Sequence, residues 1–161
     1  MAYIDYEYYK SLYGEKVLTE QEFNRILWDA EREIDKATSG VDGVKKLKVA
    51  FPTDEEDAES VKRCSAELVS FICTLNKAQN GIVSCDGTIN SNIVTSKSAG
   101  NESIAYANVE NSISTALKSV KDREKIIYQF ISSKLSGVSD ANGVKLLFAG
   151  RYPYEVKNVE I

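Results

Sequence analysis

The stretch that decides the fold is residues 53–80, TDEEDAESVKRCSAELVSFICTLNKAQN. Its apolar positions recur at spacings of three and four residues, which places them on one face of an α-helix. This pattern predicts a long helix packed lengthwise against other helices. Thr53 and Glu56 have the spacing of a capping box, so we expect the helix to begin there. Its seam comprises Val61, Ser65, Leu68, Ile72 and Leu75, widened by Cys64 and Phe71.

Four consecutive carboxylates open this helix, at residues 54–57. Such a cluster could bind a cation, but the partial positive charge at a helix N-terminus also favours acidic residues in the first turn. We favour the dipole explanation and expect no metal site there.

Two more helices are expected before this one. Residues 5–13 carry tyrosines on one helical face, and Gly14 can adopt the conformation that ends a helix. Residues 19–22 form a capping box that predicts a second helix to about Thr38. The apolar stripe of this second helix is Phe23, Ile26, Leu27, Ala30, Ile34 and Ala37.

The connector after the second helix, residues 41–52, contains Lys45, Lys46 and Lys48. Aromatic residues are not interleaved with these lysines, so they are weak support for a nucleic-acid site. We interpret them as a small basic patch on solvated surface.

Residues 81–108 differ in character, because Ile, Val and Thr alternate with small polar residues. This alternation predicts a β-hairpin with its tip near Gly100. An isolated two-stranded hairpin is only marginally stable in water, so we expect something else to cover it.

A last long helix is expected over residues 109–137, followed by a tail, 138–161, with an apolar stretch at 144–148. The length of 161 residues and the hydrophobic fraction of 43% fit a single domain over residues 1–161. We expect residues 5–80 to be its helical part. The predicted fold is mainly α: a small bundle of long helices with a β-hairpin inserted before the last long helix.

The chain contains no histidine, which removes Ser-His-Asp and Cys-His catalysis and His-ligated zinc. We see no other catalytic constellation, so we expect no enzyme activity, no metal and no cofactor. Cys64, Cys73 and Cys85 are odd in number and lack C-x-x-C spacing, which favours small buried thiols in a reducing compartment. A cysteine nucleophile would have no histidine to activate it.

The charge of the chain is concentrated at its beginning. Residues 1–40 hold nine acids and five bases, which accounts for the whole net charge of −4. This balance argues against an affinity built on neutralising phosphate groups, which needs clustered cations. No apolar run is long enough for a transmembrane helix and no secretory signal opens the chain, so we expect no membrane partner.

Three stretches together resemble one family. They are the aromatic opening with its capping box, residues 2–38; the hairpin IVTSKSAGNESIAY, residues 93–106; and the late LSG and LLFAGR, residues 135–137 and 146–151. In this order they resemble the head–tail connector (head-completion or adaptor) proteins of bacteriophages with long non-contractile tails, and their prophage copies. That family often has an aromatic–Arg–Gly order at the terminal knot, whereas this chain places Arg151 after the glycine.

The resemblance implies a helical protomer that assembles as a homo-oligomeric ring under the capsid portal protein. Such a ring extends the DNA channel without sequence-specific DNA binding and docks a stopper or tail-completion protein. It would belong to the virion neck and be made in the bacterial host cytoplasm. By this analogy the hairpin and the tail are interface elements, with Ile93, Thr95, Gly100, Ile104 and Tyr106 in the first and Leu147, Phe148 and Arg151 in the second.

Other interpretations stay open. The chain could be another neck protein, such as a stopper or tail-completion protein, or a cytoplasmic helical adaptor or regulator without a virion role. The hairpin could pack on its own helices while the apolar stretch of the tail caps the core. A ring, by contrast, needs two unlike patches on each subunit, and an exposed hairpin and an apolar tail would supply them.

Overall fold

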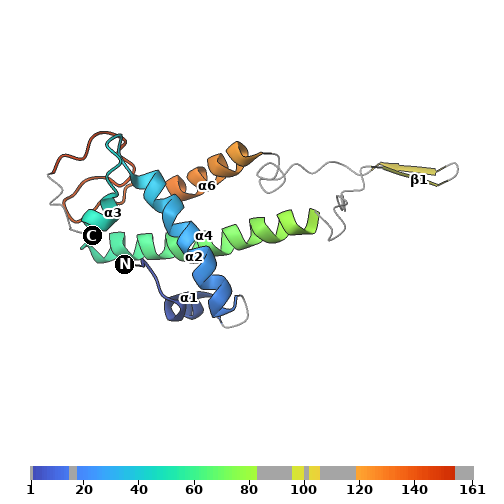
Figure 1. The fold of residues 1–161 in the computed structure, drawn as a ribbon, viewed down its shortest axis with the longest axis horizontal. Coiled ribbons are helices and arrows are strands. Elements are labelled where there is room, and N and C mark those ends of the chain that lie inside the picture. Colours follow the sequence, from blue (N-terminus) through green and yellow to red (C-terminus); the bar gives the residue numbers. More distant parts are fainter. Residues whose placement is uncertain (1, 15–17, 83–95, 100–101, 106–118, 155–161) are drawn as a thin grey trace. The chain divides into compact units, whose positions relative to one another are not determined.

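The computed structural model describes residues 2–14, 18–82, 96–99, 102–105 and 119–154 (Figure 1). Over these ranges the chain is mainly helical, which confirms the predicted fold class. The helices are α1 (Tyr6–Tyr13), α2 (Glu20–Thr38), α3 (Lys46–Val49), α4 (Glu55–Ile82) and α6 (Val120–Lys134). None of these helices is long and apolar enough to cross a membrane.

The chain divides into two compact units, one of residues 1–72 with 127–161 and one of residues 73–126. The single domain expected over 1–161 stays a prediction. The candidate site lies in the first unit.

The first two helices begin and end where their local sequence predicts. Asp5 caps α1 by accepting a hydrogen bond from the Tyr8 amide, and the Gly14 amide closes the helix on the Lys10 carbonyl with φ at 79°. Both halves of the capping box between Thr19 and Glu22 are present at the start of α2. These ends are confirmed because each depends on residues only a few positions apart.

The start of α4 differs from its prediction, because its cap is Asp54 rather than Thr53. The Asp54 carboxylate accepts hydrogen bonds from the Glu56 and Asp57 amides, both at 3.1 Å, and its carbonyl accepts the first helical bond from Ala58. A carboxylate at this position satisfies two free amides and also interacts favourably with the helix dipole, which a threonine hydroxyl does less well.

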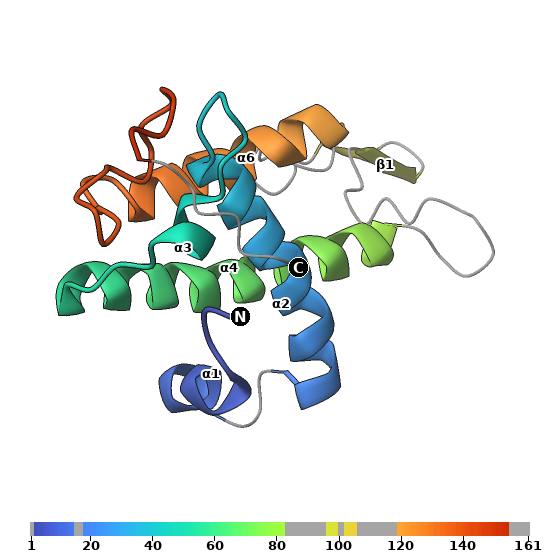
Figure 2. The same cartoon turned by 60° about the vertical axis from the view of Figure 1, so that its left-hand side comes forward.

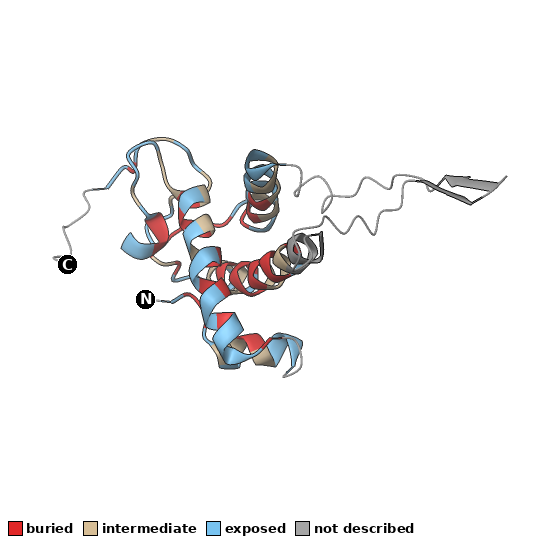
Figure 3. Cartoon of the chain, turned by 45° about the vertical axis from the view of Figure 1, so that its right-hand side comes forward, coloured by how far each residue is buried: buried red, intermediate tan, exposed pale blue. Residues whose placement is uncertain are grey.

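The core of the first unit forms where α2 crosses α4 (Figure 2). Buried positions gather along α4 and on one side of α2 (Figure 3). The predicted stripes are confirmed, apart from the half-buried Ala37 and Phe71. The buried members of the two stripes in this unit are Phe23, Ile26, Leu27, Ala30 and Ile34 on α2, and Val61, Cys64, Ser65, Leu68 and Ile72 on α4. Leu75, which is also buried, belongs to the second unit.

Aromatic contacts join the other helices of this unit to that core. Tyr9 of α1 is fully buried, its ring centroid lies 5.1 Å from that of Phe23, and its hydroxyl shares a hydrogen bond with Ser70. The rings of Phe71 and Phe130 stack with centroids 5.1 Å apart, which connects α4 with α6. Such pairs add to the free energy gained from burying apolar surface.

In the second unit, strands β1 (Ser96–Ala99) and β2 (Glu102–Ala105) pair antiparallel, with Lys97 opposite Ile104. Residues 83–95, 100–101 and 106–118 lie outside the described residues, and they include the predicted tip and the first part of the predicted helix 109–137. An inserted hairpin that another element covers therefore stays a prediction. The described part of the last helix ends at Lys134, shortly before the predicted end at Gly137.

Candidate functional site

The predicted interface residues of the tail follow a compact turn that begins at Asp140. The Asp140 carboxylate accepts hydrogen bonds from the Asn142 and Val144 amides, both at 2.9 Å, and Gly143 has a φ of 77°. The Leu146 amide returns to the Val138 carbonyl at 3.0 Å. An aspartate at the first position and a glycine at the left-handed position are the residues that such a turn favours.

Tyr152 forms hydrogen bonds both to Asp140, at the beginning of the C-terminal segment (residues 138–154), and to the connector after α2. Its buried hydroxyl donates to Asp140 at 2.6 Å, and its backbone amide donates to the Asp42 carboxylate at 2.7 Å. Burial, and then the hydrogen bond to Asp140, raise the pKa of Tyr152. The connector and the C-terminal segment are therefore joined by contacts between residues about a hundred positions apart in the sequence.

Lys46 corrects the interpretation of the connector as solvated surface. Its side chain is fully buried, and its ammonium group donates to the carbonyl oxygens of Lys145 at 3.3 Å, Leu146 at 2.9 Å and Phe148. Burial lowers the pKa of Lys46, while Asp140 and Asp42 raise it in part. A lysine can be buried here because three carbonyl acceptors match its three N–H donors.

The flanking lysines do lie exposed, because residues 46–49 form the short helix α3, which the sequence analysis did not predict. A helical turn directs neighbouring side chains to different sides, so Lys46 and Leu47 are buried while Lys45 and Lys48 are not. The amines of Lys45 and Lys48 lie 3.7 Å and 3.2 Å from the Asp35 carboxylate.

The apolar stretch of the tail is divided between core and surface. Leu146 is fully buried and Leu147 half-buried, whereas Phe148 is 49% exposed and Arg151 is exposed. The Phe148 ring centroid lies 5.7 Å from the Lys46 amine. The alternative in which this stretch caps the core thus describes Leu146 but not Phe148.

Two glycines allow Phe148 to sit where it does. A Cβ atom on Gly150 would lie 2.2 Å from the tip of the Phe148 ring, and one on Gly40 would lie 2.3 Å from the Gly150 carbonyl oxygen. The Val41 amide also donates to the Ala149 carbonyl at 3.2 Å. The ring therefore packs closely on Gly150, and a larger residue at position 40 or 150 would displace the ring or the backbone beside it.

The hairpin half of the predicted site is largely outside the described residues: Ile93, Thr95, Gly100 and Tyr106 all lie there. Ile104 belongs to β2, where its backbone pairs with Lys97. Of the predicted interface residues, the described ranges hold Leu147, Phe148 and Arg151 of the tail and Ile104 of β2.

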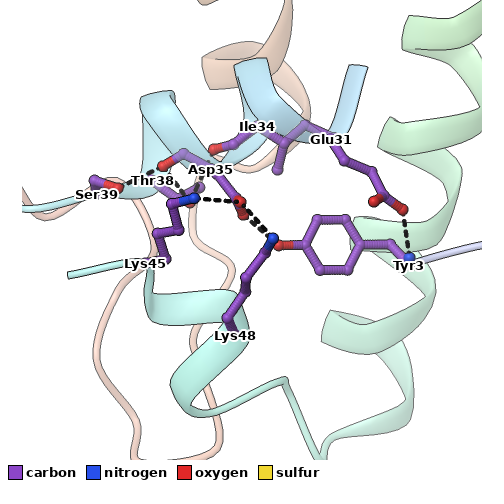
Figure 4. A network of polar contacts seen from close by, with 8 residues as sticks. All are labelled: Tyr3, Glu31, Ile34, Asp35, Thr38, Ser39, Lys45 and Lys48. Atoms are coloured by element: carbon purple, nitrogen blue, oxygen red, sulfur yellow. Dashed lines mark hydrogen bonds and ion pairs between the residues drawn. The ribbon is translucent and has the colours of Figure 1, made fainter. Parts of the chain in front are cut away.

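A second polar cluster, centred on the buried Asp35, was not anticipated (Figure 4). The Tyr3 hydroxyl donates to the Asp35 carboxylate, beside the two lysines, and the Tyr3 amide donates to Glu31 at 2.6 Å. Burial is the main cause that raises the pKa of Tyr3 and of Glu31. The cluster ties the beginning of the chain and α3 to α2.

A mainly apolar groove of about 410 Å³ borders this cluster. The rings of Tyr3 and Phe51 stack in its wall with centroids 6.0 Å apart. The groove is lined by Ala2, Tyr3, Leu47, Lys48, Phe51 and Lys62.

Within the described ranges, no group of three or more His, Cys, Asp or Glu residues could hold a metal ion. Cys64 and Cys73 are buried free thiols, as predicted for small hydrophobes, and Cys85 lies outside the described residues. Burial raises the pKa of Cys64 to about 12, which keeps this thiol neutral and weakly nucleophilic. The half-buried Leu147, the half-exposed Phe148 and the exposed Arg151 lie within five consecutive positions of the chain.

Comparisons with protein-family models, with curated proteins and with solved structures find no match to this chain.

Proposed function

We propose that this chain is a structural protein of a phage or prophage neck, which joins the capsid portal to the tail as part of a ring around the DNA channel. The proposal rests on the resemblance of residues 2–38, 93–106, 135–137 and 146–151 to head–tail connector proteins. The observation that carries it furthest is the half-exposed Phe148, which is held in a defined position on the surface.

Phe148 has the properties of an anchor for another protein. Aromatic and arginine side chains dominate the binding energy of many interfaces, and Phe148 and Arg151 lie three positions apart in the same segment. Because the ring is already fixed by Gly150 and Lys46, little of its conformational freedom remains to be lost on binding.

The charge distribution suits a ring that DNA passes through. Residues 41–161 carry equal numbers of acids and bases, and one of the three connector lysines, Lys46, is buried. A surface without clustered free cations binds phosphate groups weakly, so DNA could move past it.

The test is binding to the purified portal protein of the same phage or prophage genome, measured by sedimentation. Phe148→Ala should weaken binding by about tenfold or more, which is typical of an anchor residue. Tyr128→Ala is the matched control, because Tyr128 is similarly exposed, at 52% against 49%, but lies on α6.

Unchanged binding of the Phe148 variant, or equal loss in both variants, would contradict the assignment of the surface. A wild-type protein that binds the tail-completion or stopper protein but not the portal would indicate a different place in the neck. Failure to bind any of these proteins would favour an adaptor or regulator outside the virion.

A further inference from the structure

The buried amine of Lys46 is unusual in its partners. All three of its hydrogen bonds go to backbone carbonyls, of Lys145, Leu146 and Phe148. In the part of the chain that the structure describes, no carboxylate lies within ion-pair distance of this amine. Asp140 and Asp42 act on this charge only from beyond contact distance, so the three hydrogen bonds are what hold the ammonium group in place.

The same three bonds restrict the backbone of the C-terminal segment. For the carbonyls of residues 145, 146 and 148 to converge on one nitrogen, the backbone of that stretch must keep a turned conformation such as the one seen here. An apolar residue at position 46 would fill similar space. It would not favour this backbone conformation over others, because apolar contacts are not directional as hydrogen bonds are.

Phe148 is the side chain that this restriction acts on. Its own carbonyl is bound by Lys46, its ring lies near the same amine, and Gly150 lies directly against the tip of the ring. The Phe148 ring is nevertheless 49% exposed. The hydrogen bonds of the Lys46 ammonium group therefore restrict an exposed side chain as well as the buried lysine.

We infer that Lys46 is the positioning residue of the docking surface: by gathering the carbonyls of residues 145, 146 and 148, it sets where the Phe148 ring is presented. Lys46 itself is fully buried and does not touch the partner. The geometric part of this inference stands on the contacts alone, and the docking part rests on the proposed function.

The first test needs no partner. In Lys46→Met, the amides of Val41, Leu146 and Phe148 should exchange with deuterium about tenfold faster or more, because all three bond within or onto this segment. Leu68→Ala on α4 is the control, since it removes fully buried packing elsewhere in the same unit. Lys48→Met controls for the loss of a positive charge from an exposed neighbour.

A second measurement covers the case in which Lys46→Met does not fold. In the unaltered protein, the Lys46 ammonium protons should give a slowly exchanging NMR signal near neutral pH, since all three are hydrogen bonded in a buried site. Ammonium protons of exposed lysines such as Lys45 exchange too fast to observe there. Absence of a protected lysine signal, or unchanged amide exchange in Lys46→Met, would overturn the inference whatever the protein's function.

The docking part is tested with the purified portal protein of the same genome. The two variants are compared under conditions in which their unfolding free energies are equal. Lys46→Met should then weaken binding about tenfold, and Leu68→Ala by less than about threefold. The double variant, with both Lys46→Met and Phe148→Ala, should bind only slightly more weakly than Phe148→Ala alone, because both changes act on the Phe148 ring.

Normal binding by Lys46→Met, with Phe148→Ala impaired, would overturn the positioning role and leave the proposed function standing. Absence of wild-type binding would overturn the proposed function and with it the docking part, while the exchange result would still decide the geometric part.

Discussion

At the scale of single residues, burial at the C-terminal segment is set by backbone geometry as much as by hydrophobicity. Leu146 and Phe148 are two positions apart and both apolar, yet one is fully buried and the other half-exposed. Lys46, a charged residue, is buried more deeply than Phe148 because its donors meet carbonyl acceptors. Composition could not predict this, since the acceptors lie about a hundred residues further along the chain.

Gly40 and Gly150 should respond differently to alanine. A Cβ on Gly150 would displace the tip of the half-exposed Phe148 ring from its place, whereas a Cβ on Gly40 meets the Gly150 carbonyl oxygen, which belongs to the backbone and yields less easily. We expect Gly150→Ala to cost less than about 1 kcal/mol of unfolding free energy and Gly40→Ala about 1–3 kcal/mol. Urea denaturation measures both, and the reverse order would contradict the packing described for Phe148.

The buried thiol of Cys64 should make the protein less stable in alkali. Burial first, and then the charge of Glu67, raise the pKa of this thiol to about 12 in the folded state, from 9.0 for a free thiol. The folded state therefore holds the thiol proton more tightly. The stability that this contributes is complete below pH 9 and is lost as the pH rises toward 12.

The expected loss from Cys64 is on the order of 1 kcal/mol by pH 10. Urea denaturation between pH 8 and pH 10 should show this fall in the wild type. Cys64→Ala should show a clearly smaller fall over the same range, left by buried tyrosines with raised pKa values such as Tyr3 and Tyr152. Its stability at pH 8 should be lower by about 1 kcal/mol from lost packing. An equally steep fall in the variant would show that other groups, such as the tyrosines, are responsible.

At the scale of elements, helices with local signals were predictable. The end of α1 at Gly14, the capping box at Thr19, and the stripes of α2 and α4 depend on residues within a few positions of one another. Asp5, which was expected as the first residue of its helix, is the cap. The cap of α4 was misplaced by one residue, because Thr53 and Asp54 are both good caps and only the geometry chooses between them.

Elements that depend on distant contacts were missed. The four-residue α3 is too short to have an apolar period, and it forms where Lys46 and Leu47 enter the core. The turn at Asp140 has a recognisable aspartate and glycine, so it could have been predicted, but its attachment through Tyr152 to Asp42 could not. The candidate surface was thus predicted as a segment, while its supporting residues were not.

At the scale of the whole molecule, the proposed ring requires two unlike patches on each subunit. The predicted interface residues are distributed over both compact units. Phe148 belongs to the first unit and the strands β1 and β2 to the second. The buried core around Tyr9, Phe23 and Leu68 is built from residues of the first unit.

Replacing residues 93–106 with a short Gly-Ser linker should therefore leave a folded helical monomer that no longer assembles on the portal. The reason is that β1 and β2 bond to each other, while the buried seams of α2 and α4 lie at positions that the replacement leaves intact. Circular dichroism should retain the helical signal, and sedimentation with portal protein should show the loss of assembly. Global unfolding would mean that the hairpin supports the protein's own core, and normal assembly would mean that the second patch lies elsewhere.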